Sequence, residues 1–150
     1  MAMGCKYGSH RVLAPKGVLP QPATRISNDM STVFDNEILV DGIALNIDSA
    51  SFTQIEEEAG HDLTKIEAKI LEIVAEKGKM QNPVTGSGGM FIGKVAKVGS
   101  ALADRGLKAG DKIASLVSLS LTPLKIDKIL KIHPDIDRVE IQGQAILFES

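Results

Sequence analysis

The sequence has little of what several functional classes need. It holds one cysteine, no tryptophan, one tyrosine and four phenylalanines in 150 residues. A single cysteine excludes an internal disulfide and any zinc site built on several thiolates. Seventeen basic against nineteen acidic side chains give a net charge of −2. Because the chain is neither basic nor rich in aromatic residues, a nucleic-acid-binding surface is not expected.

Hydrophobic runs of membrane-spanning length are also missing, and the first ten residues, MAMGCKYGSH, lack the apolar segment of a signal peptide. Together with the single cysteine, this predicts a cytoplasmic protein that does not enter a membrane. What is present is ordinary for one globular domain, with 43% apolar and 24% charged residues.

The local patterns predict a mainly β fold of the α+β type, with one clear helix over about 62–77. A capping-box pattern from Thr64 to Glu67 and isoleucines at helical spacing indicate that helix, and Gly78 indicates its end. Three prolines between residues 15 and 22 favour extended chain near the N-terminus. Strands are expected at 37–46, 92–98, 112–121, 139–141 and 145–149, with a hairpin turn at 142–144. Residues 124–132 fit a short helix or a strand equally well.

Glycine-rich motifs between residues 86 and 94 imitate nucleotide-binding loops. Gly88 to Lys94 has the glycine and lysine spacing of a P-loop, but Val95 stands where the magnesium-binding serine or threonine belongs. Gly86-Ser-Gly88 begins a dinucleotide fingerprint whose third glycine is replaced by Phe91, and no βαβ unit surrounds it. A strand preceded by a tight turn is the better interpretation.

Other chemistry-bearing residues give weaker signals. Glu56, Glu57 and Glu58 with His61 and Asp62 have metal-ligand chemistry, but neighbouring side chains diverge, so an acidic segment before a helix is favoured. Cys5, His10 and His133 have no partner that the sequence identifies, and no role is assigned to them or to His61.

Longer segments resemble a known family. Val98-Gly99 followed by Gly110-Asp111-Lys112-Ile113 is similar to the catalytic domain of medium-chain dehydrogenases, and residues 38–52 are similar to the strand and loop that carry their first catalytic position. A wider set of segments resembles the zinc-less branch that oxidises diamino acids in bacterial lysine fermentation: KYGSHRVLAPKGVLPQPA, ALNIDSASFTQIEEEAGHD and AEKGKMQNPVTGSGGM.

The resemblance implies a GroES-like partial barrel over 1–150 that forms the substrate side of an enzyme. The NAD-binding Rossmann domain of the family is not in these residues, so the chain is expected to be an N-terminal portion without turnover of its own. The implied reaction is NAD-dependent oxidative deamination of a 3,5-diamino acid to a 3-oxo-5-amino acid with release of ammonia. The implied partner is this small-molecule substrate. A homo-oligomer is compatible with the resemblance.

Two departures from the zinc-dependent relatives carry the site prediction. The family's Gly-His-Glu falls on Gly88-Gly89-Met90, and its first zinc-binding cysteine falls on Asp48, so no zinc is expected. The resemblance therefore implies that Asp48 binds the substrate ammonium or accepts its proton, although Asp48 would also suit a turn after the strand.

The same resemblance implies supporting roles for three further residues. Ser49 and Ser51 would hydrogen-bond the substrate, and Glu56 would add negative potential that attracts a dication.

Two other interpretations stay open. Residues 98–113 are also similar to a PDZ domain, in which Gly88–Gly93 would capture a peptide carboxylate and residues 124–132 would form the groove helix. A stand-alone GroES-like scaffold is the third.

Overall fold

The computed structural model describes residues 2–115 and 117–148. Its main element is an antiparallel sheet in the order β5-β4-β3-β7-β6. These strands are β3 (Glu37–Ile47), β4 (Gly89–Val98), β5 (Lys112–Ser115), β6 (Leu124–His133) and β7 (Arg138–Phe148). A separate two-stranded sheet joins β1 (Val12–Ala14) to β2 (Arg25–Ile26). The sheets do not close into a barrel among the described residues, and the expected mainly β fold is confirmed.

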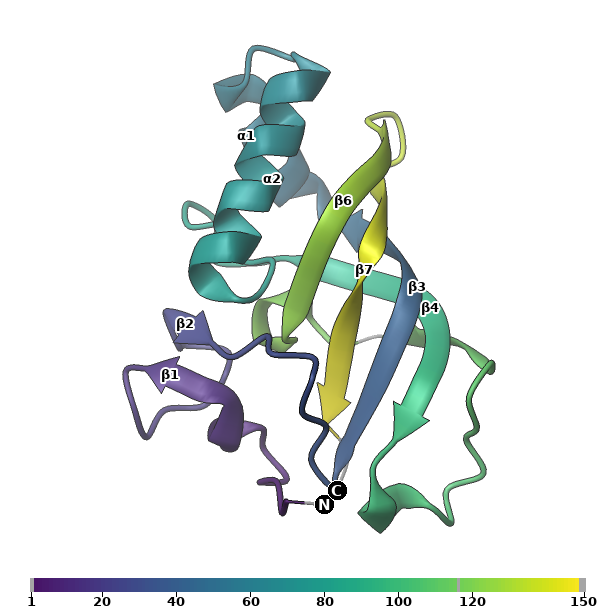
Figure 1. Ribbon diagram of the computed structural model, residues 1–150. Helices are drawn as coiled ribbons and strands as arrows, with labels where there is room; N and C mark the ends of the chain where they lie inside the picture. Colours follow the sequence, from purple (N-terminus) through teal and green to yellow (C-terminus); the bar gives the residue numbers. More distant parts are fainter. Residues whose placement is uncertain (1, 116, 149–150) are drawn as a thin grey trace.

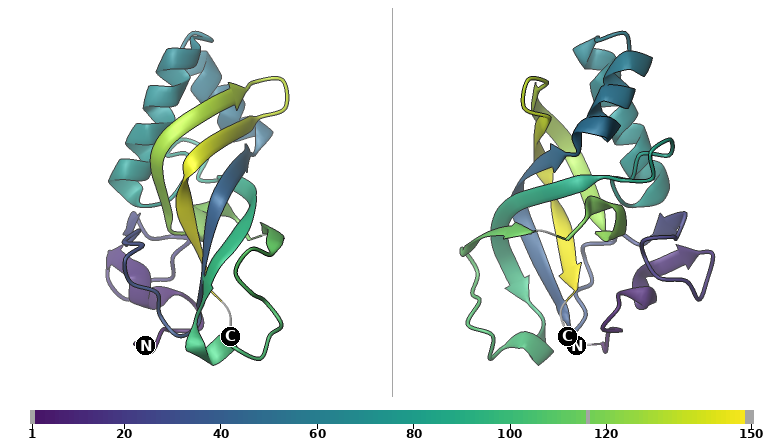
Figure 2. Two further views of the ribbon diagram at one scale, coloured as in Figure 1. Left: turned by 45° about the vertical axis from the view of Figure 1, so that its right-hand side comes forward. Right: turned by 180° about the vertical axis from the view of Figure 1, so that it is seen from behind.

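Two helices pack side by side on one face of the main sheet, α1 (Ser49–Glu58) and α2 (Leu63–Lys77) (Figures 1 and 2). Single-turn 3-10 helices lie at η1 (Ser9–Arg11), η2 (Ser100–Leu102) and η3 (Leu119–Leu121). The principal core lies between sheet and helices, where Phe52, Ile55, Ile66 and Ile70 meet strand residues such as Leu45. None of the described helices is long and apolar enough to span a membrane.

The predicted helix over 62–77 is confirmed, with a different cap. The Oδ1 atom of Asp62 accepts hydrogen bonds from the backbone amides of Thr64 and Lys65 at 2.9 and 3.3 Å, so Asp62 is the N-cap and the capping box at Thr64 was misplaced. Gly78 ends the helix with a φ of 74°, the left-handed conformation that glycine adopts without strain.

Two other local predictions were wrong, the hairpin turn at 142–144 and the extent of the strand over 112–121. Residues 138–148 form one strand, and Gly143 within it is a site of close approach, where a Cβ would lie 2.1 Å from the Lys125 carbonyl oxygen. The turn instead falls between β6 and β7, where Asp137 has a φ of 55°. The strand expected over 112–121 ends at Ser115, and the Ser118 side chain then caps η3. Positions 116 and 149, also assigned to strands, lie outside the described residues.

The structure also decides the conformation of two further segments. Residues 124–132, left undecided, belong to strand β6. Helix α1 was not predicted at all, because the segment was assigned to a loop by resemblance and its serines favour caps over helix interiors.

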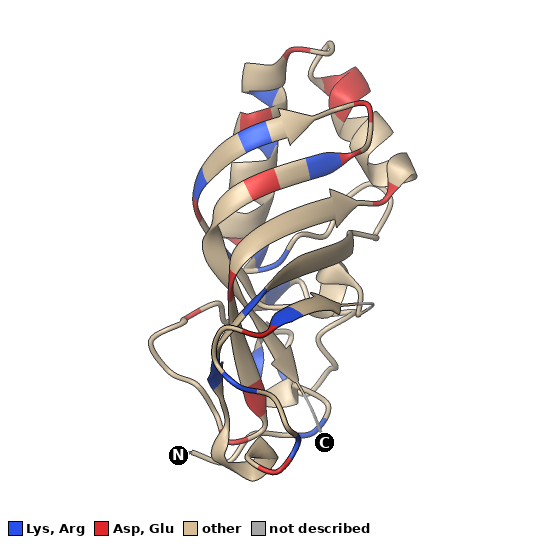
Figure 3. Cartoon of the chain, turned by 90° about the vertical axis from the view of Figure 1, so that its right-hand side faces the viewer, with Lys and Arg blue, Asp and Glu red and all other residues tan. Residues whose placement is uncertain are grey.

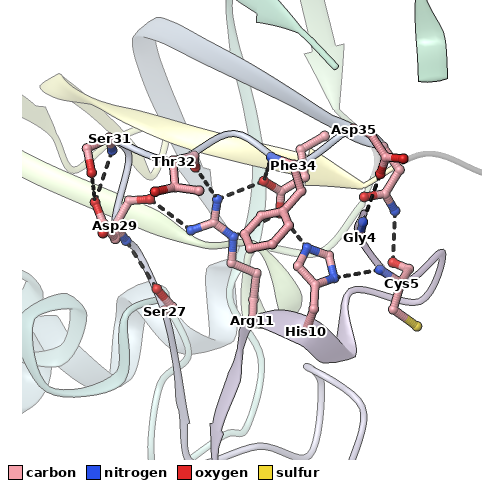
Figure 4. A network of polar contacts seen from close by, with 12 residues as sticks. Gly4, Cys5, His10, Arg11, Ser27, Asp29, Ser31, Thr32, Phe34 and Asp35 are labelled. Carbon is pink, nitrogen blue, oxygen red and sulfur yellow. Dashed lines mark hydrogen bonds and ion pairs between the residues drawn. The ribbon is translucent and has the colours of Figure 1, made fainter. Parts of the chain in front are cut away.

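A buried ion pair holds the N-terminal segment against the start of β3 (Figure 4). The guanidinium of Arg11 donates to both carboxylate oxygens of Glu37 at 2.7 and 2.8 Å, and to the backbone carbonyls of Asp29 and Thr32. Burial alone would raise the pKa of Glu37, but the hydrogen bonds from Arg11, the Phe34 amide and His10 outweigh it and lower the pKa. The pair thereby fixes the N-terminal end of the central strand.

His10 and Cys5 extend this network. Nδ1 of His10 accepts from the Cys5 amide at 2.8 Å, so its Nε2 carries the proton and donates to Glu37, also at 2.8 Å. Hydrogen bonds with the Ser9 side chain and neighbouring backbone lower the pKa of the Cys5 thiol. The structure thus gives His10 a structural place that the sequence did not indicate.

Replacing Glu37 by Gln should destabilise the fold by about 3 kcal/mol at neutral pH, because the Arg11 charge would stay buried without its counter-ion. The Glu37 contribution should be present above its ordinary pKa of about 4.5 and be lost as pH falls through the lower folded pKa. Urea unfolding measures both effects. Glu140→Gln, which removes the exposed partner of His133, is the matched control, and an equal loss there would contradict the account.

Lys79 makes a second pH-dependent contribution to the free energy of unfolding. Its buried ammonium donates to the carbonyls of Pro20 and Gln21 at 2.6 and 3.2 Å, and burial, aided by the charge of Lys77, lowers its pKa to about 8. Between about pH 8 and 10.5 the unfolded chain binds a proton that the folded chain has released, so stability should rise with pH. Lys79→Met should flatten this rise in urea titrations, and the exposed-site control Lys128→Met should retain it.

Candidate active site

An open, shallow hollow of about 650 Å³ lies at the end of β3 and the start of β4. Its lining comes from the end of β3, from the glycine-rich segment that leads into β4, and from the residue before η3. The lining residues are Asn46, Ile47, Asp48, Ser87, Gly88, Gly89, Met90 and Ser118. The two family positions identified in the sequence, Asp48 and Gly88–Met90, therefore face the same space. Their proximity follows from the antiparallel register, in which Asn46 pairs with Met90 and Ile47 with Gly89.

Asp48 has two different carboxylate oxygens. It is the N-cap of α1, and its Oδ1 accepts from the Ser51 amide at 2.9 Å. Its Oδ2 is buried and has no hydrogen-bond partner in the described structure. A buried carboxylate oxygen without a donor is costly, so a ligand ammonium at this oxygen would relieve an unfavourable arrangement. Capping and ligand binding are thus compatible roles, one for each oxygen.

Two glycines make this geometry accessible. The Asp48 amide donates to the Gly88 carbonyl at 3.0 Å, which ties the start of α1 to the segment before β4. At Gly89 the φ is 131°, and a Cβ would lie 2.1 Å from the Asn46 carbonyl oxygen. No larger residue fits this backbone, so a zinc-binding histidine has no place at Gly89.

The residues lining the hollow also do not suit a zinc ion. They offer one carboxylate and two serine hydroxyls but neither imidazole nor thiolate. Elsewhere, no group of three or more His, Cys, Asp or Glu residues that could hold a metal occurs within 2–115 and 117–148. The His61 side chain pairs with Glu56, its Nδ1 lying 3.6 Å from Glu56 Oε2. The expectation of a zinc-free site stays a prediction.

Ser51 takes part in a hydroxyl cluster. Its buried Oγ lies 2.6 Å from Thr85 Oγ1 and 3.0 Å from Ser87 Oγ. Ser87 lines the hollow, whereas Ser51 reaches it through Ser87. Ser49 is exposed in the first turn of α1, outside the hollow. Substrate contact by either predicted serine stays a prediction.

Negative charge gathers beside Asp48. The Asp137 carbonyl accepts from the Ile47 amide at 3.0 Å, which places the β6–β7 turn next to the end of β3. Burial raises the pKa of the Asp137 carboxyl, and the negative charges of Glu56 and Asp48 raise it further. Glu56 thus lies close enough to act on Asp137, which the sequence did not indicate, and the predicted attraction of a dication by Glu56 stays a prediction.

Sequence reasoning also missed Asn46, Ser87 and Ser118. Ser87 adjoins the counterpart of the Gly-His-Glu motif, which is a usable signal, and Asn46 lies near the end of β3, two residues before Asp48. Ser118 is brought in from a distant segment, and no local pattern indicates it.

Gly88–Lys94 is neither a phosphate loop nor a carboxylate-binding loop. The strand predicted over 92–98 is present but begins earlier, at Gly89, and its backbone pairs with β3 on one side and β5 on the other. Residues 124–132, the groove helix of the PDZ interpretation, are a strand. The PDZ interpretation is therefore wrong.

A family model described as the L-erythro-3,5-diaminohexanoate dehydrogenase N-terminal domain matches residues 10–150. The chain belongs to this family. Proteins named L-erythro-3,5-diaminohexanoate dehydrogenase from Fusobacterium nucleatum and Acetoanaerobium sticklandii are each 73% identical to it, over 151 and 148 residues. These alignments cover 100% and 98% of the chain, but only 44% and 43% of the relatives. The chain thus spans less than half the length of the curated relatives that it matches.

Gly89→Ala should destabilise the protein by at least about 2 kcal/mol more than Gly86→Ala, as measured by urea unfolding. Both glycines have positive φ, but the space around a Cβ is open at Gly86 and blocked by backbone at Gly89. The difference between the two losses of stability measures the effect of the close approach of β4 to β3. Equal losses at the two positions would contradict it.

Proposed function

We propose that this chain is the substrate-side domain of an NAD-dependent enzyme that deaminates L-erythro-3,5-diaminohexanoate to 5-amino-3-oxohexanoate in lysine fermentation. The names of the relatives support the substrate. The observation that carries the proposal is Asp48 itself, which lines the hollow between β3 and β4 and whose buried Oδ2 has no hydrogen-bond partner in the described structure. A carboxylate there has the charge and hydrogen-bonding capacity to bind an amino group.

Asp48 orients the reacting amine and takes its proton. An ammonium has no lone pair, so it must lose a proton before the neighbouring carbon can release hydride. Asp48 Oδ2 accepts that proton, while Oδ1 stays bonded to the Ser51 amide and keeps the carboxylate in place. The hydroxyls of Ser87 and Ser118 add donors and acceptors for the remaining polar groups of the substrate.

NAD, when bound, supplies the hydride acceptor. The described residues do not fit its phosphates, because the glycine-rich segment that imitates a phosphate loop enters a strand paired on both sides, and no helix begins there. We assign NAD binding to polypeptide that corresponds to the remaining length of the relatives.

Asp48→Asn tests the proposal in a chimera in which this chain replaces the matching 44% of the Fusobacterium nucleatum relative. Asparagine is as good an N-cap as aspartate, so stability should change by less than about 1 kcal/mol. Because the amide cannot accept the proton, kcat/KM with 3,5-diaminohexanoate should fall by about 100-fold or more, followed by NADH absorbance.

Thr53→Ala, at an exposed position of α1, is the matched control and should retain activity within about twofold. Full activity of Asp48→Asn would overturn the proposed role of Asp48. A chimera that folds, forms a stable oligomer and has no dehydrogenase activity would instead support the scaffold interpretation.

Asp137 provides a separate test of how the second amino group is recognised. Asp137→Asn removes one of the charges that act together beside the hollow, so KM for 3,5-diaminohexanoate should rise about fivefold or more. KM for 3-aminohexanoate, which lacks the second amino group, should change much less. Equal effects on the two substrates would show that Asp137 does not discriminate a diamine.

A further inference from the structure

The main sheet has one face that its own residues leave uncovered. The helices cover the other face, and Figure 3 looks onto the bare side, where uncharged positions dominate the central strands. A hollow of about 630 Å³ lies there, spanning β3, β4, β5, β7 and Leu130 of β6. It is separate from the lining of the Asp48 hollow and has no part in the proposed chemistry.

The two halves of this face differ in composition. The outward positions of β7 are polar, as expected of a solvated antiparallel sheet, and include Glu140, which pairs with Ala44; the half formed by β3, β4 and β5 has an apolar centre. Ala114, Ile92 and Ala44 are directly opposite one another on β5, β4 and β3, forming an apolar row. Ile92 is 41% exposed, and Leu130, which borders the same hollow, is 58% exposed.

The edge strand β6 provides an internal comparison. It presents Lys125, Asp127 and Lys128 to solvent, the pattern expected where nothing packs.

Charge at the hollow adds a second observation. Arg138, Lys94 and Lys112 line it, against one carboxylate, Glu140, which is already bonded to His133 at 2.8 Å. Nε of Arg138 is buried and lacks a hydrogen-bond acceptor within the described residues. The face therefore fits a polypeptide surface with an apolar centre and at least one carboxylate or carbonyl directed at Arg138.

We propose that this face, defined by Ala44, Ile92, Ala114, Leu130 and Arg138, is the docking surface for the part of the full-length dehydrogenase that lies outside the 44% matched by this chain. This docking proposal rests on the proposed function in one respect: it requires the chain to be part of a longer dehydrogenase. More than half of each relative's length is available to cover it. Covering Ile92 and Leu130 would remove exposed apolar surface, and an acceptor would satisfy Arg138.

Site-directed thiol labelling tests the proposal. Cys5 is first replaced by Ser, because its thiol is the only native one and has a lowered pKa. Ile92→Cys and the matched strand position Lys128→Cys are then labelled with a maleimide in the isolated chain and in the chimera described above. Ile92→Cys should react at least about tenfold more slowly in the chimera than in the isolated chain, while Lys128→Cys should react at similar rates in both.

Equal rates for Ile92→Cys in the two proteins would overturn the proposal. So would slow labelling in the isolated chain accompanied by a dimer in sedimentation, because a second copy would then be the occupant. Should Ile92→Cys fail to fold, Leu130→Cys, at a position 58% exposed that borders the same hollow, gives the same comparison against Lys128→Cys.

Dehydrogenase activity of the chimera separates this inference from the proposed function. Protection of Ile92 in an inactive chimera would support the docking surface and count against the proposed activity. An active chimera with unprotected Ile92 would do the reverse.

Discussion

The close approach of β4 to β3 is the constraint on which the site depends. Gly88 and Gly89 lack the Cβ atoms that would collide with the backbone of neighbouring segments, so the Gly88 carbonyl reaches the Asp48 amide. That contact sets where β3 ends and α1 begins. It also leaves Asp48 with one oxygen bonded inside the helix cap and one without a partner. The geometry around Asp48 thus depends on the absence of a Cβ atom at two glycines.

The two ends of β3 hold two carboxylates in different surroundings. At its start, β3 is fixed by the buried pair of Glu37 and Arg11, which is fully hydrogen-bonded. At its end, Asp48 is left partly unsatisfied. Both oxygens of the Glu37 carboxylate have donors, whereas one oxygen of the Asp48 carboxylate has none, and this contrast is typical of a structural and a ligand-binding role. The negative charges of Glu56 and Asp48 help to raise the pKa of the Asp137 carboxyl, so acidic side chains gather at this end of the strand.

The sequence predicted what is locally encoded. The helix over 62–77 was found because its periodicity and its glycine stop are local signals, and the strand that ends near Asp48 was found for the same reason. Helix α1 was missed because its stability comes from burying Phe52 and Ile55 against distant residues. Gly143 was taken for a turn because its real neighbour, the Lys125 carbonyl, is brought close only by strand pairing. The juxtaposition of Asp48 with Gly88–Met90 required a family resemblance, since no local pattern contains it.

The central claim is that the hollow beside Asp48 binds a diamino acid. Its most direct test is an amide NMR titration of the isotope-labelled chain with 3,5-diaminohexanoate. The account predicts saturable shifts at Asp48, Ser51 and Gly89, with the Arg11–Glu37 network unmoved and the shifts abolished by Asp48→Asn. Shifts confined to other parts of the chain, or shifts at the hollow that persist in Asp48→Asn, would contradict it.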